Sequence, residues 1–195
     1  MNRFFLISLI MFCTCLTAHA QDGAHGDDYE AWYVAIGPAM GSGLGTTEAM
    51  SQFYLGYGWA SPENLIKIYI GGAGSENDEY ASASGLGLSY SHFLSRGDKR
   101  WFVNGDMISG SVTANFDPPA LNADSTFEER LEHDDEKERL MESNSKSGYL
   151  LGIGVGRLFV NPSVDFEIGF QSNVFLGKLR TGIPATHNFR VGVFF

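Results

Sequence analysis

The stretch that decides the fold is Phe53-Tyr54-Leu55-Gly56-Tyr57-Gly58-Trp59-Ala60. Large apolar or aromatic side chains occupy every second position, and glycine or alanine fills most of the positions between them. Successive side chains of a β-strand point to opposite faces, whereas an amphipathic helix repeats every three to four residues. The stretch is therefore predicted to be a strand with one face of large residues and one face of mostly small residues.

Seven further segments alternate in the same way, and they cover 31–37, 66–70, 85–90, 101–107, 149–156, 164–171 and 189–195. Short turns at 61–63, 95–99 and 161–163 separate some of these strands, and four longer loops separate the others. Outer-membrane barrels have this asymmetry, with short periplasmic turns and longer external loops. We therefore predict an all-β fold, a closed antiparallel barrel of eight transmembrane strands with both termini in the periplasm.

The composition of the face with mostly small residues distinguishes a membrane barrel from a soluble one. A soluble β-sandwich or lipocalin-like barrel, the alternative fold, would present polar side chains to water on this face. Here the face carries mainly Gly, Ala and Ser with a few charges, as in a narrow lumen that side chains from opposite walls must share. Phe, Tyr and Trp recur near the predicted strand ends, which is typical of aromatic girdles at the membrane interfaces.

The first twenty residues are predicted to be a secretory signal peptide. Arg3 precedes an apolar run at 4–16 that is too short to span a bilayer, and Ala18-His19-Ala20 has the form of a cleavage site. Cleavage after Ala20 would leave a barrel domain at 21–195 and would remove both cysteines, Cys13 and Cys15. The net charge of −10 argues against nucleic acid as a partner.

Five charged residues fall on the small-residue face and are candidates for an ion network inside the lumen: Lys67, Asp106, Asp165, Glu167 and Arg190. An isolated ion in a low-dielectric interior is costly, so these side chains should pair or keep water. If Phe195 lies near Val164, Arg190 falls beside Gly169 and within reach of Glu167. We expect a lumen filled by side chains, and a gated pore through a narrow porin is the alternative.

Residues 116–147 form a long acidic segment, predicted as the third external loop, with ten acidic and four basic residues. The loop is either flexible or contains a short surface helix from Ser125 to about Met141, because Ser125 and Glu128 have the spacing of a capping box. We consider divalent cations near lipopolysaccharide, or a basic surface partner, as ligands of this segment. No EF-hand spacing is present, and we expect neither a resident metal nor a cofactor.

The last segment carries a family resemblance. Phe189, Val191, Val193 and Phe195 alternate up to a C-terminal phenylalanine, and Trp32-Tyr33-Val34 opens the first strand. The chain from residue 21 onward resembles the small OmpA/OmpX-type, porin-like barrels of the bacterial outer membrane. The resemblance implies that these four residues are the signal read by the barrel-assembly machinery. It also implies lipid and lipopolysaccharide as surroundings, and we expect no peptidoglycan-binding domain after Phe195.

Catalysis is the remaining alternative. A lipid A acyl hydrolase would need a nucleophile and a base in contact near the outer leaflet. Ser172 and His187 would lie opposite each other on the lipid face in the register above, without an evident acid to orient the histidine, while His92 falls near the periplasmic end. We therefore expect no catalytic residues, and a non-enzymatic integral barrel that presents external loops for envelope stability, adhesion or partner binding.

Overall fold

The computed structural model describes residues 28–43, 49–75, 81–114, 126–161, 164–179 and 182–195. Eight strands make up most of this part of the chain: β1 (Tyr29–Ser42), β2 (Ala49–Ala60), β3 (Asn64–Ser75), β4 (Ser82–Phe93), β5 (Lys99–Thr113), β6 (Ser145–Phe159), β7 (Asp165–Phe175) and β8 (Ala185–Phe194). One helix, α2 (Phe127–Ser143), lies between β5 and β6. The predicted signal peptide lies outside the described residues.

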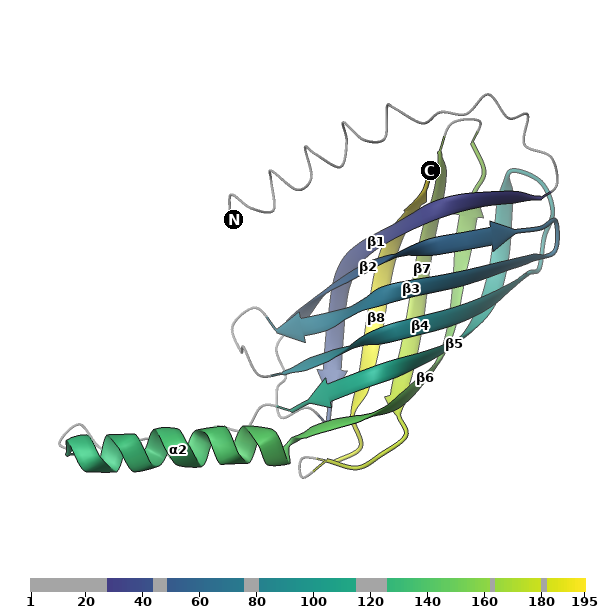
Figure 1. The fold of residues 1–195 in the computed structure, drawn as a ribbon. Helices are drawn as coiled ribbons and strands as arrows, with labels where there is room; N and C mark the ends of the chain where they lie inside the picture. Colours follow the sequence, from purple (N-terminus) through teal and green to yellow (C-terminus); the bar gives the residue numbers. More distant parts are fainter. Residues whose placement is uncertain (1–27, 44–48, 76–80, 115–125, 162–163, 180–181) are drawn as a thin grey trace.

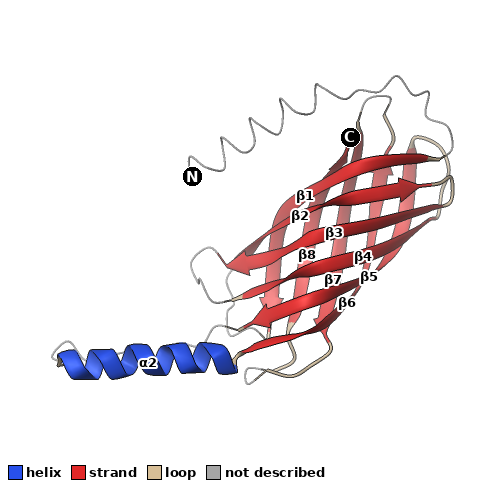
Figure 2. Ribbon diagram, in the orientation of Figure 1, coloured by secondary structure: helices blue, strands red, loops and turns tan. Residues whose placement is uncertain are grey.

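The strands form one closed barrel in which each strand pairs with its neighbours in sequence and β8 returns to β1 (Figure 1). All pairs are antiparallel, and Figure 2 shows the strands wrapped around a single interior. The seam between the first and last strands ends in two backbone hydrogen bonds. Trp32 N donates to Phe195 O at 2.9 Å, and Phe195 N donates to Trp32 O at 3.0 Å. The predicted fold class is confirmed.

The two faces of the wall differ as the alternation predicts. Outward side chains are large, apolar and exposed, and Ile153 is 76 % exposed. Among those predicted to point outward, Val34 is buried at 8 %, but the others that are described remain half-buried or exposed. A water-soluble fold does not leave a continuous belt of such residues uncovered. A closed barrel with an apolar exterior and no free strand edge is the arrangement that spans a membrane, so the soluble alternatives are wrong.

The two ends of the barrel differ in the length of the connections between strands. We call the end with the short connections the inner end and the opposite end the outer end. The inner end carries the short connections at 61–63, 94–98 and 160–164 together with the start of β1 and the end of β8. The outer end carries the longer connections, including α2 (Figure 1). Because periplasmic turns are short and external loops are long, the inner end faces the periplasm.

Strands β5 and β6 are longer than the alternation predicts, with 15 residues each. Their outer ends are rich in serine and glycine, and they remain paired up to Thr113 and Ser145. Backbone hydrogen bonds form a ladder whether or not the side chains alternate in polarity, so this extension left no pattern in the sequence. Residues 145–147, predicted as loop, therefore belong to β6.

The acidic segment contains a helix of 17 residues, α2, in place of a fully flexible loop. Its capping box lies one residue later than the predicted one. Glu129 N donates to Thr126 Oγ1 at 3.3 Å, and Thr126 N donates to Glu129 Oε2 at 2.8 Å. Thr126 is thus the N-cap, and the helix begins at Phe127. In the part of the chain that the structure describes, no helix is long and apolar enough to cross a membrane.

Candidate functional site

Three charged side chains meet in the middle of the lumen. Glu167 of β7 accepts a hydrogen bond from Lys67 Nζ of β3 at 2.7 Å and another from Arg190 Nε of β8 at 2.8 Å. The side chains of Lys67 and Glu167 are fully buried, and that of Arg190 is 3 % exposed. We call these three residues the lumen triad. It joins strands from opposite walls, and each charge-assisted bond replaces water that burial has removed.

The pairing register explains why Arg190 reaches Glu167. Arg190 lies directly opposite Gly169, as the sequence predicted. A Cβ atom at Gly169 would lie 3.8 Å from Arg190 Nε, so the guanidinium packs across a position that has no side chain. Arg190 also donates to Gln171 Oε1, two positions along the same face of β7. The register prediction is confirmed.

Aromatic rings surround the buried ammonium group. Lys67 Nζ lies 4.6 Å from the ring centroid of Tyr33, 5.9 Å from that of Phe194 and 6.0 Å from that of Phe102. Cations within about 6 Å of an aromatic face are attracted by the negative charge density of the ring. The hydroxyl of Tyr33 donates to Glu167 Oε1 at 3.3 Å. The triad is therefore enclosed by side chains and has no open contact with either end of the barrel.

The two aspartates predicted for the same network form no salt bridge with Lys67 or Arg190 and are held by neutral donors. Asp106 accepts from Tyr69 Oη at 3.1 Å and from Asn104 Nδ2. Asp165 accepts from the backbone N–H of Asn161 at 2.9 Å and from the hydroxyl of Tyr29 near the inner end. The tyrosines were missed as partners although strand parity places Tyr33 and Tyr69 inward. Alternation gives the face on which each of these two side chains lies, but not the carboxylate that each one meets.

Apolar side chains close the lumen on both sides of this polar layer. Towards the inner end, the rings of Tyr33 and Phe194 pack with their centroids 4.7 Å apart. Leu65 and Leu158 are fully buried there. Towards the outer end, the larger buried apolar residues include Met50, Val112, Phe175 and Leu179. Leu179 lies in the connection between β7 and β8 and belongs to the same buried cluster as the strand residues. The interior therefore has a polar centre between two apolar plugs.

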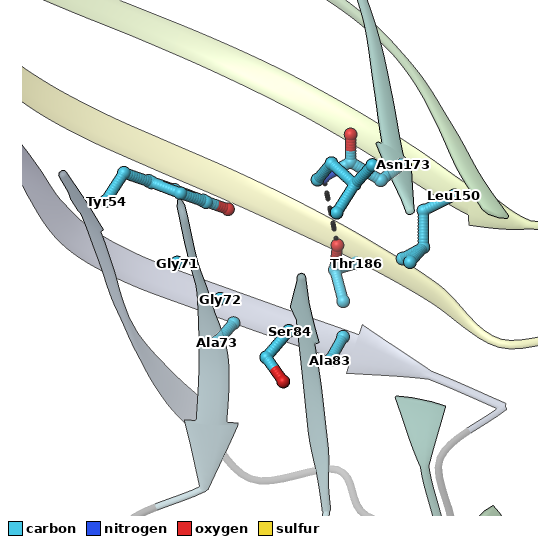
Figure 3. A pocket seen from close by; sticks show the side chains of 10 residues that line it. Tyr54, Gly71, Gly72, Ala73, Ala83, Ser84, Leu150, Asn173 and Thr186 are labelled. Carbon is cyan, nitrogen blue, oxygen red and sulfur yellow. Dashed lines mark hydrogen bonds between the residues drawn. The ribbon is translucent and has the colours of Figure 1, made fainter. Parts of the chain in front are cut away.

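Between the triad and the outer plug there is one narrow cavity (Figure 3). Its volume is about 10 Å³, and Tyr54, Asn173 and Thr186 are among the residues that line it. Asn173 Nδ2 donates to Thr186 Oγ1 at 3.2 Å across one wall. A cavity of this volume holds about one water molecule. It offers no site for a larger solute.

Helix α2 stands at the outer end and projects away from the barrel (Figure 1). It carries eight acidic and three basic residues, a net charge of −5. The six acidic side chains that the structure describes are all exposed: Glu128, Glu129, Glu132, Asp134, Asp135 and Glu136. Asp117 and Asp124 of the same predicted loop lie outside the described residues. Within the described ranges, no group of three or more His, Cys, Asp or Glu side chains is arranged to hold a metal ion.

The histidines considered for catalysis lie at opposite ends of the lipid-facing surface. Ser172 Oγ lies 2.8 Å from His187 Nδ1, and the two residues are direct partners across β7 and β8. No carboxylate among the described residues contacts His187. His92 lies near the inner end, where its Nδ1 is 3.0 Å from Asn64 Oδ1. The residues of the predicted assembly signal are placed on the outer face of β8, where Phe189 and Val191 are exposed.

No protein-family model matches the sequence, and no curated protein matches it. Solved structures do. The crystal structure of Neisserial surface protein A (NspA) is 11 % identical, with a TM-score of 0.61, covering 87 % of this chain and 98 % of that chain. At this identity the likeness shows the fold, a small eight-stranded outer-membrane barrel.

Two further solved structures are similar over comparable lengths. The N-terminal β-barrel domain of Pseudomonas aeruginosa OprF is 12 % identical, with a TM-score of 0.46, covering 86 % of this chain and 100 % of that chain. Ail, the attachment invasion locus protein of Yersinia pestis, was solved in complex with the heparin analogue sucrose octasulfate. It is 11 % identical, with a TM-score of 0.45, covering 87 % of this chain and 98 % of that chain.

Proposed function

We propose that this integral outer-membrane barrel is a non-enzymatic scaffold that presents an acidic external arm to a basic surface partner. The arm is the described helix α2. The observation that carries the proposal is the position of α2, which leaves the barrel at its outer end with its described acidic side chains exposed. Adhesion and envelope stability are the cellular roles that such a contact serves.

The packing of the lumen supports a scaffold rather than a channel. The lumen triad is buried, and the apolar plugs lie on both sides of it. An eight-stranded barrel leaves an interior just wide enough for side chains, and here side chains occupy it. A solute that crosses the barrel would have to displace both Leu158 near the inner end and Phe175 near the outer end. This packing supports a barrel that does not conduct solutes.

The charge distribution of the arm supports a basic partner. Acidic residues occur from the first turn to the last turn of the helix, and its last turn carries no basic residue. Its described apolar side chains, Phe127 and Leu131, are exposed, so they do not pack the helix against its own barrel. Exposed like charges attract an oppositely charged surface over roughly a Debye length, about 8 Å at physiological salt. Divalent cations bridging to lipopolysaccharide would use the same charges.

Two contacts with the envelope belong to the proposal. The apolar outer face lies against lipid and lipopolysaccharide, whose acyl chains match the exposed aromatic and aliphatic side chains. The terminal strand, with Phe189, Val191, Val193 and Phe195, is the segment that the barrel-assembly machinery would read. Its outward apolar positions support this role, and a polar replacement such as F195S should reduce insertion.

Binding of a basic probe tests the arm. The purified barrel in nanodiscs is mixed with a fluorescent decalysine peptide, and D134N/D135N/E136Q is compared with the natural chain. We expect the substituted arm to bind several-fold more weakly, with the difference vanishing at high salt. The matched control, E30Q/E63Q/D98N, removes three exposed acids at the inner end. Equal weakening by both triple variants, or by neither, would contradict the proposal.

Conductance and lipid analysis test the two alternatives. Large, steady single-channel currents in planar bilayers would replace the scaffold with a narrow porin. A lipid A acyl pattern that changes on expression of the natural chain, but not of S172A, would replace it with an acyl hydrolase. We expect neither change. Heat-modifiable migration on gels serves as the folding control for every variant.

A further inference from the structure

A polar pair interrupts the apolar outer surface of the barrel. Ser172 of β7 and His187 of β8 face each other directly, and their Oγ and Nδ1 atoms are 2.8 Å apart. Both side chains point away from the lumen, because Gln171 and Asn173 on either side of Ser172 are buried. The pair therefore lies on the surface that contacts lipid.

Its surroundings on that surface are apolar. Along β7, Phe170 and Val174 flank Ser172, and along β8 Phe189 follows His187, all of them exposed. On the adjoining strands, Ile153 lies opposite Ser172 and Met40 lies opposite His187. Polar atoms in such a setting have no water to bind and are costly unless a hydrogen-bonding partner is near.

The contact between the two side chains leaves one donor unused in either tautomer. If the serine hydroxyl donates to Nδ1, the histidine carries its hydrogen on Nε2. If Nδ1–H donates to Oγ, the serine hydroxyl hydrogen is free instead. Among the described residues, the imidazole of His187 has a hydrogen bond only with Ser172. The pair thus offers one unsatisfied donor to the lipid, whichever way the proton is arranged.

The depth of Ser172 and His187 in the bilayer indicates which lipid group can accept a hydrogen bond from them. His187 lies eight residues from Phe195 along the terminal strand. With a rise of about 3.4 Å per residue and a tilt near 45°, this places the pair roughly 20 Å from the inner edge of an apolar band about 25 Å tall. The pair is therefore near the outer edge of the hydrocarbon, where the acyl chains join their headgroup. The hydrogen-bond acceptors at that depth are acyl carbonyl oxygens.

We propose that Ser172 and His187 form a binding site for an acyl carbonyl of an outer-leaflet lipid. The serine orients the imidazole, and the free donor of the pair binds the carbonyl oxygen. The carbonyl belongs to an ester or amide, so a phospholipid and the lipid A of lipopolysaccharide share the chemistry. The inference depends on the orientation of the barrel and is independent of the acidic arm, so either can fail without the other.

Exchange of ester lipid for ether lipid tests the site without altering the protein. The ¹⁵N-histidine-labelled barrel is placed in vesicles of dioleoylphosphatidylcholine or of its dialkyl ether analogue, which has no carbonyl. We expect the ring nitrogen resonances of His187 to shift between the two vesicles. Those of His133, which lies on α2 and away from the bilayer, should stay in place. Adding lipopolysaccharide to the ether vesicles restores the shift if lipid A is a source of the carbonyl.

Three variants complete the test. H187Q assigns the resonance, S172A should reduce the shift by releasing the imidazole, and H92Q is the matched control that leaves it unchanged. Identical His187 resonances in ester and ether vesicles would overturn the proposal. Release of fatty acid that requires both residues would also overturn it, because the pair would then be a nucleophile and its base. If a variant does not fold, the lipid exchange on the natural chain still decides.

Discussion

The lumen and the arm of this barrel both carry charged side chains, and they use them in opposite ways. In the lumen, the carboxylate of Glu167 is fully buried and contacts two cations. In the arm, α2, the six described acidic side chains are exposed. Over the whole helix, the sequence has eight acids and three bases. A buried ion pair is needed for stability, because removal of one partner leaves the other charge in the interior without water or a counter-ion. Exposure leaves the charges free for a partner.

The largest expected effect comes from removing the shared carboxylate of the lumen triad. Glu167→Ala leaves Lys67 and Arg190 as two unpaired cations a short distance apart in the lumen. Breaking a buried pair in this way costs about 3–5 kcal/mol of the free energy of unfolding. Urea unfolding of the barrel in lipid vesicles measures it. The control, Glu63→Gln, breaks an exposed pair with Arg96 and should cost at most about 1 kcal/mol; equal losses would contradict the comparison.

Removing one cation should cost less than removing the carboxylate. Lys67→Met leaves Glu167 paired with Arg190 at 2.8 Å and places an apolar chain among the rings that surrounded the ammonium. The loss is that of one hydrogen bond to a charged group, about 1.5–3 kcal/mol. The same urea titration gives the value. A loss as large as that of Glu167→Ala would mean that the triad does not act through its shared carboxylate.

Two glycines sharpen the contrast between the lumen and the outer wall. A Cβ atom at Gly87 would lie 2.3 Å from the ring of Tyr69, whose hydroxyl binds Asp106. Gly87→Ala should therefore destabilise the barrel by about 1–3 kcal/mol. At Gly105 a Cβ atom meets nothing within 4 Å, so Gly105→Ala should be neutral or slightly stabilising. The midpoint of urea unfolding measures both variants. A lower midpoint for Gly105→Ala than for Gly87→Ala would contradict the packing of the lumen.

The smallest effect is expected in the arm. Thr126→Ala removes the side chain of the capping box and should weaken the helix by about 1 kcal/mol. Hydrogen exchange of the α2 amides should speed up about fivefold. The urea midpoint of the barrel should not move, because α2 has few contacts with the wall. A parallel loss of barrel stability would show that the arm is a structural part of the barrel.

Much of the fold could be predicted because the two faces of each strand meet different surroundings. The pattern at Phe53–Ala60 and the pairing of Arg190 with Gly169 both follow from a period of two. The serine- and glycine-rich outer ends of β5 and β6 could not be predicted, since neither face there is large and apolar. The helix cap was predicted one residue too early because Ser125 and Thr126 are each followed three residues later by a glutamate.

By itself, the sequence determined the closed barrel, the direction in which most side chains of the predicted strands point and the acidic character of the arm, because these depend on local alternation and composition. Only the tertiary structure decided which charges meet. Lys67 and Glu167 are 100 residues apart and belong to strands on opposite walls, so their contact depends on the curvature of the closed sheet. The same closure left Asp106 and Asp165 to tyrosine hydroxyls, since the geometry of the lumen, not parity, sets the distance between charges.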